Sequence, residues 1–203
     1  MKKLLASLVL AFGLISGSAH AVVEVGKTAP NYAFKDIKGN GHSIAGYKGK
    51  IVVLEWTNPG CPFVQKFYNG GEMQRVQREA LKDTDVVWIS IKSSAKGKEG
   101  YLSRAEASKY LTDHKVASSA YVRDYSGKFG KLYGAKTTPH MFVIGKDGNV
   151  VYQGAIDSIK SPDAEDIAKA DNYVLKALAA LKDGKQPEKT STEPYGCSVK
   201  YGN

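Results

Sequence analysis

The chain has 203 residues, which is long enough for a domain with a proper hydrophobic core, and its 29 basic and 20 acidic residues give a formal net charge of +9. The basic residues are scattered among acidic ones, a pattern typical of a solvated lysine-rich surface and not of a nucleic-acid-binding patch, so no nucleic-acid partner is expected. With only two cysteines in the sequence, any thiol chemistry depends on Cys61 and Cys197.

The N-terminal residues have the three parts of a secretory signal peptide. The basic start Met1–Lys3 precedes the apolar stretch Leu4–Ile15, and Ala19-His20-Ala21 has the small-x-small pattern of a cleavage site. A retained membrane anchor is the less favoured alternative, because the apolar stretch is too short to span a bilayer. We therefore expect a signal peptide over residues 1–21, a mature periplasmic or secreted domain over 22–203, and no stable membrane insertion.

Strand and helix patterns alternate along the first half of the mature chain. A turn-rich N-terminal extension over 22–50 contains Gly39-Asn40-Gly41, which suits a hairpin. An apolar strand comes next, then a helix interrupted by a Gly-Gly pair, a short buried strand, and a helix with a capping-box pattern. These elements are expected at 51–57, 62–82 with a break at 69–71, 85–91, and 103–114 with the box at Ser103 and Glu106.

The second half continues the alternation and ends in a polar tail. It shows a short strand, a short helix, two strands joined by the turn Gly145-Lys146-Asp147-Gly148, and an amphipathic helix. These elements are expected at 121–124, 126–133, 141–144 with 149–156, and 163–182, and the tail over 185–203 carries Cys197. The order predicts a single α/β domain in which helices flank a central mixed sheet.

Cys61 is the first candidate for a catalytic residue. It directly follows a predicted strand and its turn, and it precedes a predicted helix. A cysteine at a helix start faces unpaired backbone N–H groups and the positive end of the helix dipole, which favour thiolate over thiol. Cys61 is therefore a candidate nucleophile.

Four motifs, together with this order of elements, resemble a known family. They are Gly60-Cys61-Pro62-Phe63-Val64, Asn69-Gly70-Gly71-Glu72-Met73-Gln74, Lys136-Thr137-Thr138-Pro139-His140-Met141 and Tyr195-Gly196-Cys197-Ser198-Val199-Lys200-Tyr201. The layout resembles the thioredoxin fold. The motifs resemble the exported peroxiredoxin-like redoxin-domain proteins, in the branch of the thioredoxin superfamily that contains alkyl hydroperoxide reductases and thiol-specific antioxidants. The resemblance implies a thioredoxin-like fold over nearly the whole mature chain and redox chemistry at Cys61, for which we expect no cofactor.

The sequence departs from the motifs of related proteins at two places, and each departure disfavours one type of redox reaction at Cys61. Thioredoxins carry Cys-x-x-Cys, whose second thiol resolves a mixed disulfide, but here that position is Val64. Peroxiredoxins carry Pro-x-x-x-Thr/Ser-x-x-Cys, but here the proline and hydroxyl positions are Leu54 and Asn58. Resolution by a neighbouring thiol is therefore excluded, and a standard peroxide-binding site is disfavoured.

Cys197 is the remaining partner for Cys61, and two roles stay open for it. In an exported chain, two cysteines can pair in one way only, so a Cys61–Cys197 disulfide is expected. The bond could belong to a working redox couple in which Cys197 resolves the mixed disulfide. It could instead be a permanent structural link that stabilises the fold, although the redox couple is favoured because a helix-start cysteine is a good leaving group.

The substrate-binding residues are assigned mainly from the resemblance. In the thioredoxin fold the proline that corresponds to Pro139 follows a cis peptide bond, and the backbone before it, here Thr138, lies beside the nucleophile and pairs with the substrate chain. Asn58 and Pro62, which flank Cys61 in the sequence, complete this set.

His140 is the last residue assigned to the site, and its orientation is open. It could point toward Cys61 and move a proton, or strand alternation could turn it away. Together with Cys61 and Cys197 it would form a soft-metal site, but the paired-cysteine spacing of such sites is absent, so no metal is expected.

These observations favour an exported thiol-disulfide oxidoreductase in which Cys61 attacks and Cys197 resolves. Its partners would be protein thiols and disulfides, or a small thiol or peroxide, with an electron donor that the sequence does not identify. Two alternatives stay open: a thiol peroxidase, and a non-enzymatic binding domain with a structural Cys61–Cys197 disulfide.

Overall fold

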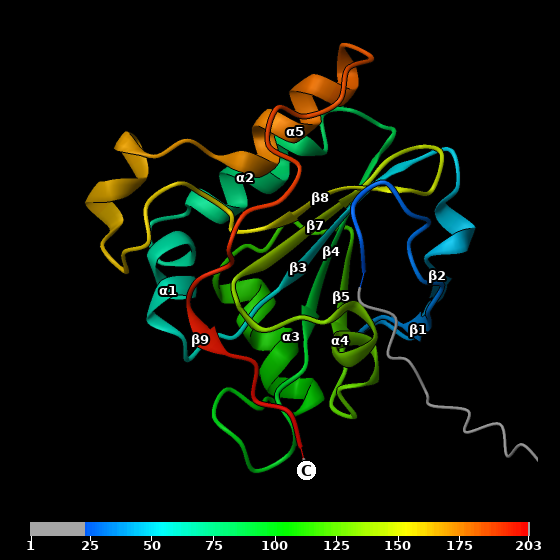
Figure 1. Cartoon of the computed structure of the whole chain (residues 1–203). Coiled ribbons are helices and arrows are strands. Elements are labelled where there is room, and N and C mark those ends of the chain that lie inside the picture. Colours follow the sequence, from blue (N-terminus) through cyan, green and yellow to red (C-terminus); the bar gives the residue numbers. More distant parts are fainter. Residues whose placement is uncertain (1–22, 203) are drawn as a thin grey trace, which may run out of the picture.

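The computed structural model of the chain describes residues 23–202, so the expected signal peptide lies outside the described residues. Five strands form the central sheet: β3 (Ile51–Trp56), β4 (Val86–Lys92), β5 (Ala120–Arg123), β7 (His140–Ile144) and β8 (Val150–Gly154). Their order across the sheet is β5-β4-β3-β7-β8 (Figure 1). The pairs β3–β4 and β4–β5 are parallel, and β3–β7 and β7–β8 are antiparallel. The predicted mixed sheet is confirmed.

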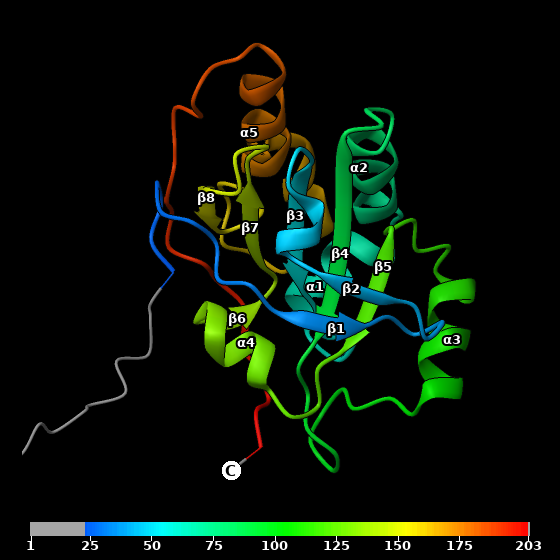
Figure 2. The same ribbon diagram turned by 90° about the vertical axis from the view of Figure 1, so that its right-hand side faces the viewer.

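Both faces of the sheet are covered. On one face lie α1 (Pro62–Tyr68), α2 (Glu72–Ala80) and α5 (Tyr173–Lys182); on the other lie α4 (Lys128–Tyr133), the 3-10 turn η1 (Ala45–Tyr47) and the hairpin of β1 (Ala33–Lys35) with β2 (Gly41–Ser43), as Figure 2 shows. The helix α3 (Arg104–Asp113) contributes Ala107 to a small cluster with Tyr121 of β5.

This two-sided burial explains why β3 reads as a nearly continuous apolar run instead of an alternating one. Successive residues of a strand point to opposite faces, so Val53 packs in the cluster that contains α1, α2 and α5, while Val52 packs with α4 and the hairpin. Every residue of β3 is buried. The strand therefore ends inside the protein, and the turn that leads to Cys61 begins from a fixed position.

Local signals placed several elements correctly. The predicted helix break is present as the boundary between α1 and α2, where Gly71 has a φ of 80°, a conformation that favours glycine. The predicted capping box is also present, since the Ser103 hydroxyl accepts from the N–H of Glu106 and the Glu106 carboxylate accepts from the N–H of Ser103.

The expectation of one helix over 163–182 is wrong. The structure has a 3-10 helix, η2 (Ala164–Lys169), and a separate α5 that begins after Asn172. Ala170 is extended, and the Asn172 side chain accepts a hydrogen bond from the N–H of Leu175, which caps the new helix.

The C-terminal tail, red in Figure 1, runs back across the molecule from the end of α5 toward α1. It runs beside β8, where the Thr192 N–H donates to the carbonyl of Gln153, and its strand β9 (Cys197–Ser198) pairs antiparallel with β6 (Thr137–Thr138). Sequence analysis placed no strand in this tail. In the described part of the chain, no helix combines the length and apolar character needed to cross a membrane.

Candidate active site

Cys61 lies at the junction between β3 and α1, as predicted. It is the N-cap of α1, with extended backbone angles, and Pro62 occupies the first helical position. Its carbonyl accepts hydrogen bonds from the N–H groups of Val64 and Gln65, which begin the helix. Its side chain has no solvent exposure. The nucleophile candidate is thus held by the backbone and shielded from water.

The Cys61 thiol is directed at β6. Its Sγ donates to the carbonyl oxygen of Thr138 at 3.0 Å, and the Thr138–Pro139 peptide bond is cis. Thr138, which was predicted to bind the substrate backbone, therefore contacts Cys61, the predicted nucleophile. The two residues are 77 positions apart in the sequence, and the pairing of β3 with β7 brings them together.

Cys197 reaches the same residue from the tail. In the β6–β9 register Cys197 lies opposite Thr138, and the Thr138 hydroxyl donates to the Cys197 carbonyl at 3.4 Å. Burial, followed by the hydrogen bond and the charge of the neighbouring Cys61, raises the pKa of Cys197 to about 12. The two thiols are therefore neighbours, and Cys197 retains its proton at neutral pH.

Both cysteines are free thiols in this structure, so the expected Cys61–Cys197 disulfide is not formed in it. Both residues meet at one backbone position, Thr138: Cys61 Sγ bonds its carbonyl, and Cys197 lies opposite it in the β6–β9 register. The two thiols also lie within hydrogen-bonding reach of each other, which suits a reversible bond between them.

Asn58 shapes the turn before Cys61. Its Oδ1 accepts from the N–H of Gly60 at 3.0 Å, and its carbonyl accepts from the N–H of Cys61. The side chain is buried under Gly100, where an added methyl group would overlap Oδ1. Pro62, in contrast, is exposed. Of the two flanking residues assigned to the substrate site, only Pro62 has a surface that a partner could contact in this structure.

His140 is not brought to Cys61. Its Nδ1 accepts a hydrogen bond from the N–H of Lys136 at 3.2 Å, and its ring packs on Phe142 with centroids 4.6 Å apart. Phe142 belongs to the opposite core cluster from Cys61, because alternate residues of β7 face alternate sides of the sheet. Burial lowers the pKa of His140 to about 3, which keeps the ring neutral. Of the two orientations left open for His140, the structure has the one that faces away from Cys61, so the ring is not in place to act on the nucleophile.

The same orientation removes the soft-metal alternative based on His140. Within residues 23–202, no three His, Cys, Asp or Glu side chains are grouped so that they could hold a metal ion.

A buried carboxylate, Glu55, lies close to the site and belongs to none of the motifs identified in the sequence. Glu55 is the one charged residue within the apolar strand β3, and this interruption was its only signal in the sequence. It accepts hydrogen bonds from four side chains: Tyr68 at 2.6 Å, Gln77 at 3.1 Å, Trp88 at 2.8 Å and Ser90 at 2.9 Å. Burial raises the pKa of Glu55.

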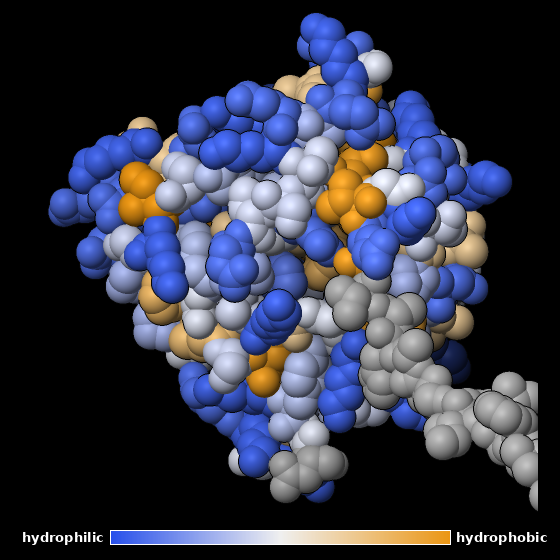
Figure 3. Space-filling model, viewed as in Figure 1, coloured by the Kyte–Doolittle hydropathy of each residue, from blue (hydrophilic) through white to orange (hydrophobic). Residues whose placement is uncertain are grey.

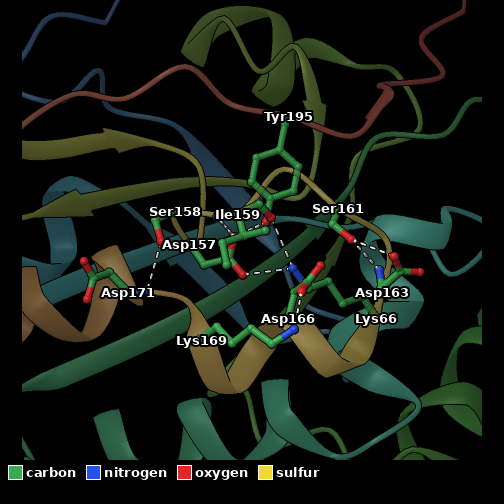
Figure 4. Close-up of polar contacts among 10 residues, drawn as sticks. All are labelled: Lys66, Asp157, Ser158, Ile159, Ser161, Asp163, Asp166, Lys169, Asp171 and Tyr195. Atoms are coloured by element: carbon green, nitrogen blue, oxygen red, sulfur yellow. Dashed lines mark hydrogen bonds and ion pairs between the residues drawn. The ribbon is translucent and has the colours of Figure 1, made fainter.

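A buried ion pair, which no motif of the sequence indicates, also lies near the site. Lys66 of α1 bonds Asp157 at 3.0 Å, and the Lys66 side chain has no solvent exposure. The Tyr195 hydroxyl donates to the other carboxylate oxygen of Asp157, as Figure 4 shows. This trio connects the helix that begins at Cys61 with the tail that carries Cys197.

Comparisons with known proteins find a matching family and similar sequences. A model of the Redoxin family matches residues 24–172. The thiol-disulfide oxidoreductase ResA of Bacillus thuringiensis subsp. konkukian is 28% identical over 138 residues, which cover 64% of this chain and 69% of ResA. The peroxiredoxin Bcp of Bacillus subtilis is 25% identical over 170 residues, which cover 79% of this chain and 96% of Bcp.

Solved structures match the fold. An uncharacterized conserved protein from Geobacillus kaustophilus superposes with a TM-score of 0.76 at 22% identity, covering 90% of this chain and 94% of that one. The thioredoxin domain of the thiol-disulfide oxidoreductase BVU-2223 from Bacteroides vulgatus superposes with a TM-score of 0.50 at 19% identity, covering 72% of this chain and 96% of that one. The fold is therefore thioredoxin-like, which confirms the predicted fold class.

Proposed function

Since the chain belongs to the redoxin family and is an oxidoreductase with a thioredoxin-like fold, we propose that it is an exported thiol-disulfide oxidoreductase with Cys61 as nucleophile and Cys197 as resolving cysteine. The observation that carries the proposal is the meeting of both cysteines at Thr138. Cys61 bonds its carbonyl, and Cys197 pairs with it in the β6–β9 ladder.

The reaction is derived from the positions of the two sulfurs. The Cys61 thiolate attacks one sulfur of a partner disulfide, the partner S–S bond breaks, and the other partner sulfur leaves as a thiolate that takes up a proton. The Cys197 thiolate then attacks the Cys61 sulfur and releases the second partner thiol. The partner gains two electrons and two protons, and the enzyme ends as a Cys61–Cys197 disulfide that an external dithiol reduces.

The raised pKa of Cys197 supports this order of events. A thiol that keeps its proton at neutral pH is a poor first attacker, because the thiolate is the nucleophile. Burial is the largest cause of this raised pKa and remains in the mixed disulfide, whereas the contributions of Cys61 are removed there, so Cys197 ionises more easily once Cys61 is bonded to the partner. Export rests on the signal-peptide pattern of residues 1–21.

A thiol peroxidase is a second candidate. Cys61 is completely buried, and a small oxidant reaches a buried sulfur more easily than a protein does. Here the Cys61 thiolate would attack a hydroperoxide, release an alcohol or water and become a sulfenic acid. Cys197 would then form the same disulfide and release water.

The test uses purified mature protein, Cys197→Ser and Cys61→Ser, each reduced and then mixed with glutathione disulfide. We expect a lasting glutathione adduct on Cys197→Ser, an internal disulfide in the wild type, and almost no adduct on Cys61→Ser, all by intact mass. Hydrogen peroxide in parallel separates the two candidates, because a peroxidase would be oxidised much faster by peroxide than by glutathione disulfide. Equal adducts on both variants would refute the assigned roles.

A further inference from the structure

The backbone of β6 contacts the reactive sulfur directly, since the Thr138 carbonyl lies 3.0 Å from Cys61 Sγ. Cys61 Sγ bonds the Thr138 carbonyl, so any strand that pairs with Thr137–Thr138 places one of its residues beside that sulfur. In the described structure the edge of β6 is occupied by β9, and the residue so placed is Cys197. An unpaired strand edge accepts an extended peptide through backbone hydrogen bonds.

The tail is attached on both sides of Cys197. Before it, Tyr195 is buried, packs edge-on against Phe63 with ring centroids 5.7 Å apart, and donates to Asp157 of the buried ion pair (Figure 4). After it, the Tyr201 hydroxyl donates to the carbonyl of Ala135 at 2.8 Å. Cys197 therefore reaches Cys61 only as part of a segment, Tyr195–Tyr201, that docks as a unit.

The fit between tail and edge demands glycine directly before the cysteine. Gly196 has a φ of 129°, outside the range that other residues adopt readily, and an added methyl group would overlap the carbonyl of Thr138. Gly196 thus lets the two backbones approach closely enough for the cysteine to reach Cys61.

The surface around the tail is largely polar on the face that Figure 3 shows. On the face that Figure 3 shows, which the tail crosses in Figure 1, the described residues are mostly hydrophilic and the hydrophobic ones form small separate groups. Recognition there depends on backbone pairing and on the few side chains beside Cys61, not on a broad apolar patch.

We propose that the segment Tyr195–Tyr201 is a built-in mimic of the partner: it competes for the Thr137–Thr138 edge, and the partner is an extended polypeptide segment with glycine immediately before its disulfide-bonded cysteine. This proposal rests on the proposed function. It identifies the class of partner and adds that the tail controls the partner's access to Cys61. The tail leaves, the partner docks and forms a mixed disulfide with Cys61. The returning tail then displaces the partner backbone while Cys197 displaces its sulfur.

The test measures how fast Cys61 reacts with two probes in the Cys197→Ser protein. One probe is 2,2'-dithiodipyridine, which needs no strand docking. The other is a synthetic peptide that copies residues 193–201, with its cysteine linked by a disulfide to 2-thiopyridine. Attack on the peptide sulfur releases pyridine-2-thione, which is detected by its absorbance. The rate constant with the peptide divided by the rate constant with 2,2'-dithiodipyridine reports how accessible the Thr137–Thr138 edge is.

Loosening the tail should raise that ratio. Adding Gly196→Ala should increase it by at least about tenfold, since the rate follows the fraction of molecules with a free edge. Tyr201→Phe, which loses only the bond to Ala135, should increase it by roughly threefold. The control Gly41→Ala, where an added methyl group meets nothing within 4 Å, should leave the ratio unchanged.

A second peptide tests the glycine requirement. A copy with alanine before the cysteine should react about tenfold more slowly than the parent peptide with the Cys197→Ser/Gly196→Ala protein.

The outcomes separate the two proposals. If Cys61 reacts with neither probe, the proposed function fails. If both probes react but Gly196→Ala and Tyr201→Phe leave the ratio unchanged, or if the two peptides react equally, the proposal of a partner mimic is overturned and the proposed function stands. Circular dichroism and thermal unfolding check each variant, and Tyr201→Phe decides the question if Gly196→Ala does not fold.

Discussion

At the scale of single residues, two buried ionisable side chains differ in how the protein accommodates them. Glu55 of β3 has four hydrogen-bond donors around its carboxylate. Lys92 ends β4 and is completely buried, yet its Nζ has no hydrogen-bond partner among the described residues. Burial lowers the pKa of Lys92 to about 7. The network around Glu55 stabilises a polar group in the core, whereas Lys92 is a source of instability whenever it is charged.

The lowered pKa of Lys92 predicts that the stability of the protein depends on pH. Because the pKa is about 7 in the folded state and 10.5 ordinarily, unfolding takes up a proton between these values, and the free energy of unfolding rises as pH rises through that window. Lys92→Met removes this effect. The stabilisation that Lys92→Met brings, measured by urea unfolding, should be larger at pH 6 than at pH 9 by roughly 3 kcal/mol.

The control for this experiment is Lys96→Met, because Lys96 is an exposed lysine on the loop after β4. It should change the free energy of unfolding by less than about 0.5 kcal/mol at either pH. A gain from Lys92→Met that is the same at both pH values would show that charge burial is not the cause.

At the scale of elements, the boundary before α5 depends on one side chain. Asn172 lies at the N-cap, and its Oδ1 accepts from the N–H of Leu175 at 2.9 Å. The same residue comes shortly after the extended Ala170, where the chain changes direction between η2 and α5. α5 covers β7 and β8 through Val174, Ala177 and Leu178, so its starting point positions part of the core.

Asn172→Ala should therefore lower the free energy of unfolding by about 1 kcal/mol, since an N–H of the first turn loses its acceptor. Asn172→Ser is the matched comparison, because serine also caps helices, and it should lose far less. Urea unfolding at one pH measures both. Equal losses in the two variants would attribute the effect to packing of the larger side chain.

At the scale of the whole molecule, the tail joins the end of the chain to its centre. Three contacts lie in succession along it: Thr192 with β8, Tyr195 with the Lys66–Asp157 pair, and β9 with β6. A disulfide between Cys61 and Cys197 would close a loop that contains most of the chain. Redox state should therefore change global stability as well as activity.

We expect the oxidised wild-type protein to exceed the reduced protein in free energy of unfolding by about 4–5 kcal/mol, the value for a loop of this size in the chain-entropy model. Urea unfolding with and without dithiothreitol, with the bond verified by intact mass, measures the difference. Cys197→Ser should show no response to dithiothreitol. Equal stabilities of the two wild-type forms would contradict a bond that constrains the unfolded chain.

The sequence by itself determined the features that depend on neighbouring residues. The strand before Cys61, the helix after it, the glycine break at Gly71, the Ser103 capping box and the hairpin of β7 and β8 were all predictable. Each has a local cause: the period of apolar residues, a side chain that bonds the backbone within one turn, or a glycine that adopts positive φ.

Only the tertiary structure decided where distant segments meet. The pairing of Cys197 with Thr138, the Lys66–Asp157 pair and the turning of His140 away from Cys61 depend on strand register and on the packing of segments far apart in the sequence. A two-residue strand such as β9 has no periodicity of its own, because it exists through its partner β6. The physical reason is that local preferences act over a few residues, whereas these contacts form only once the core has fixed the sheet.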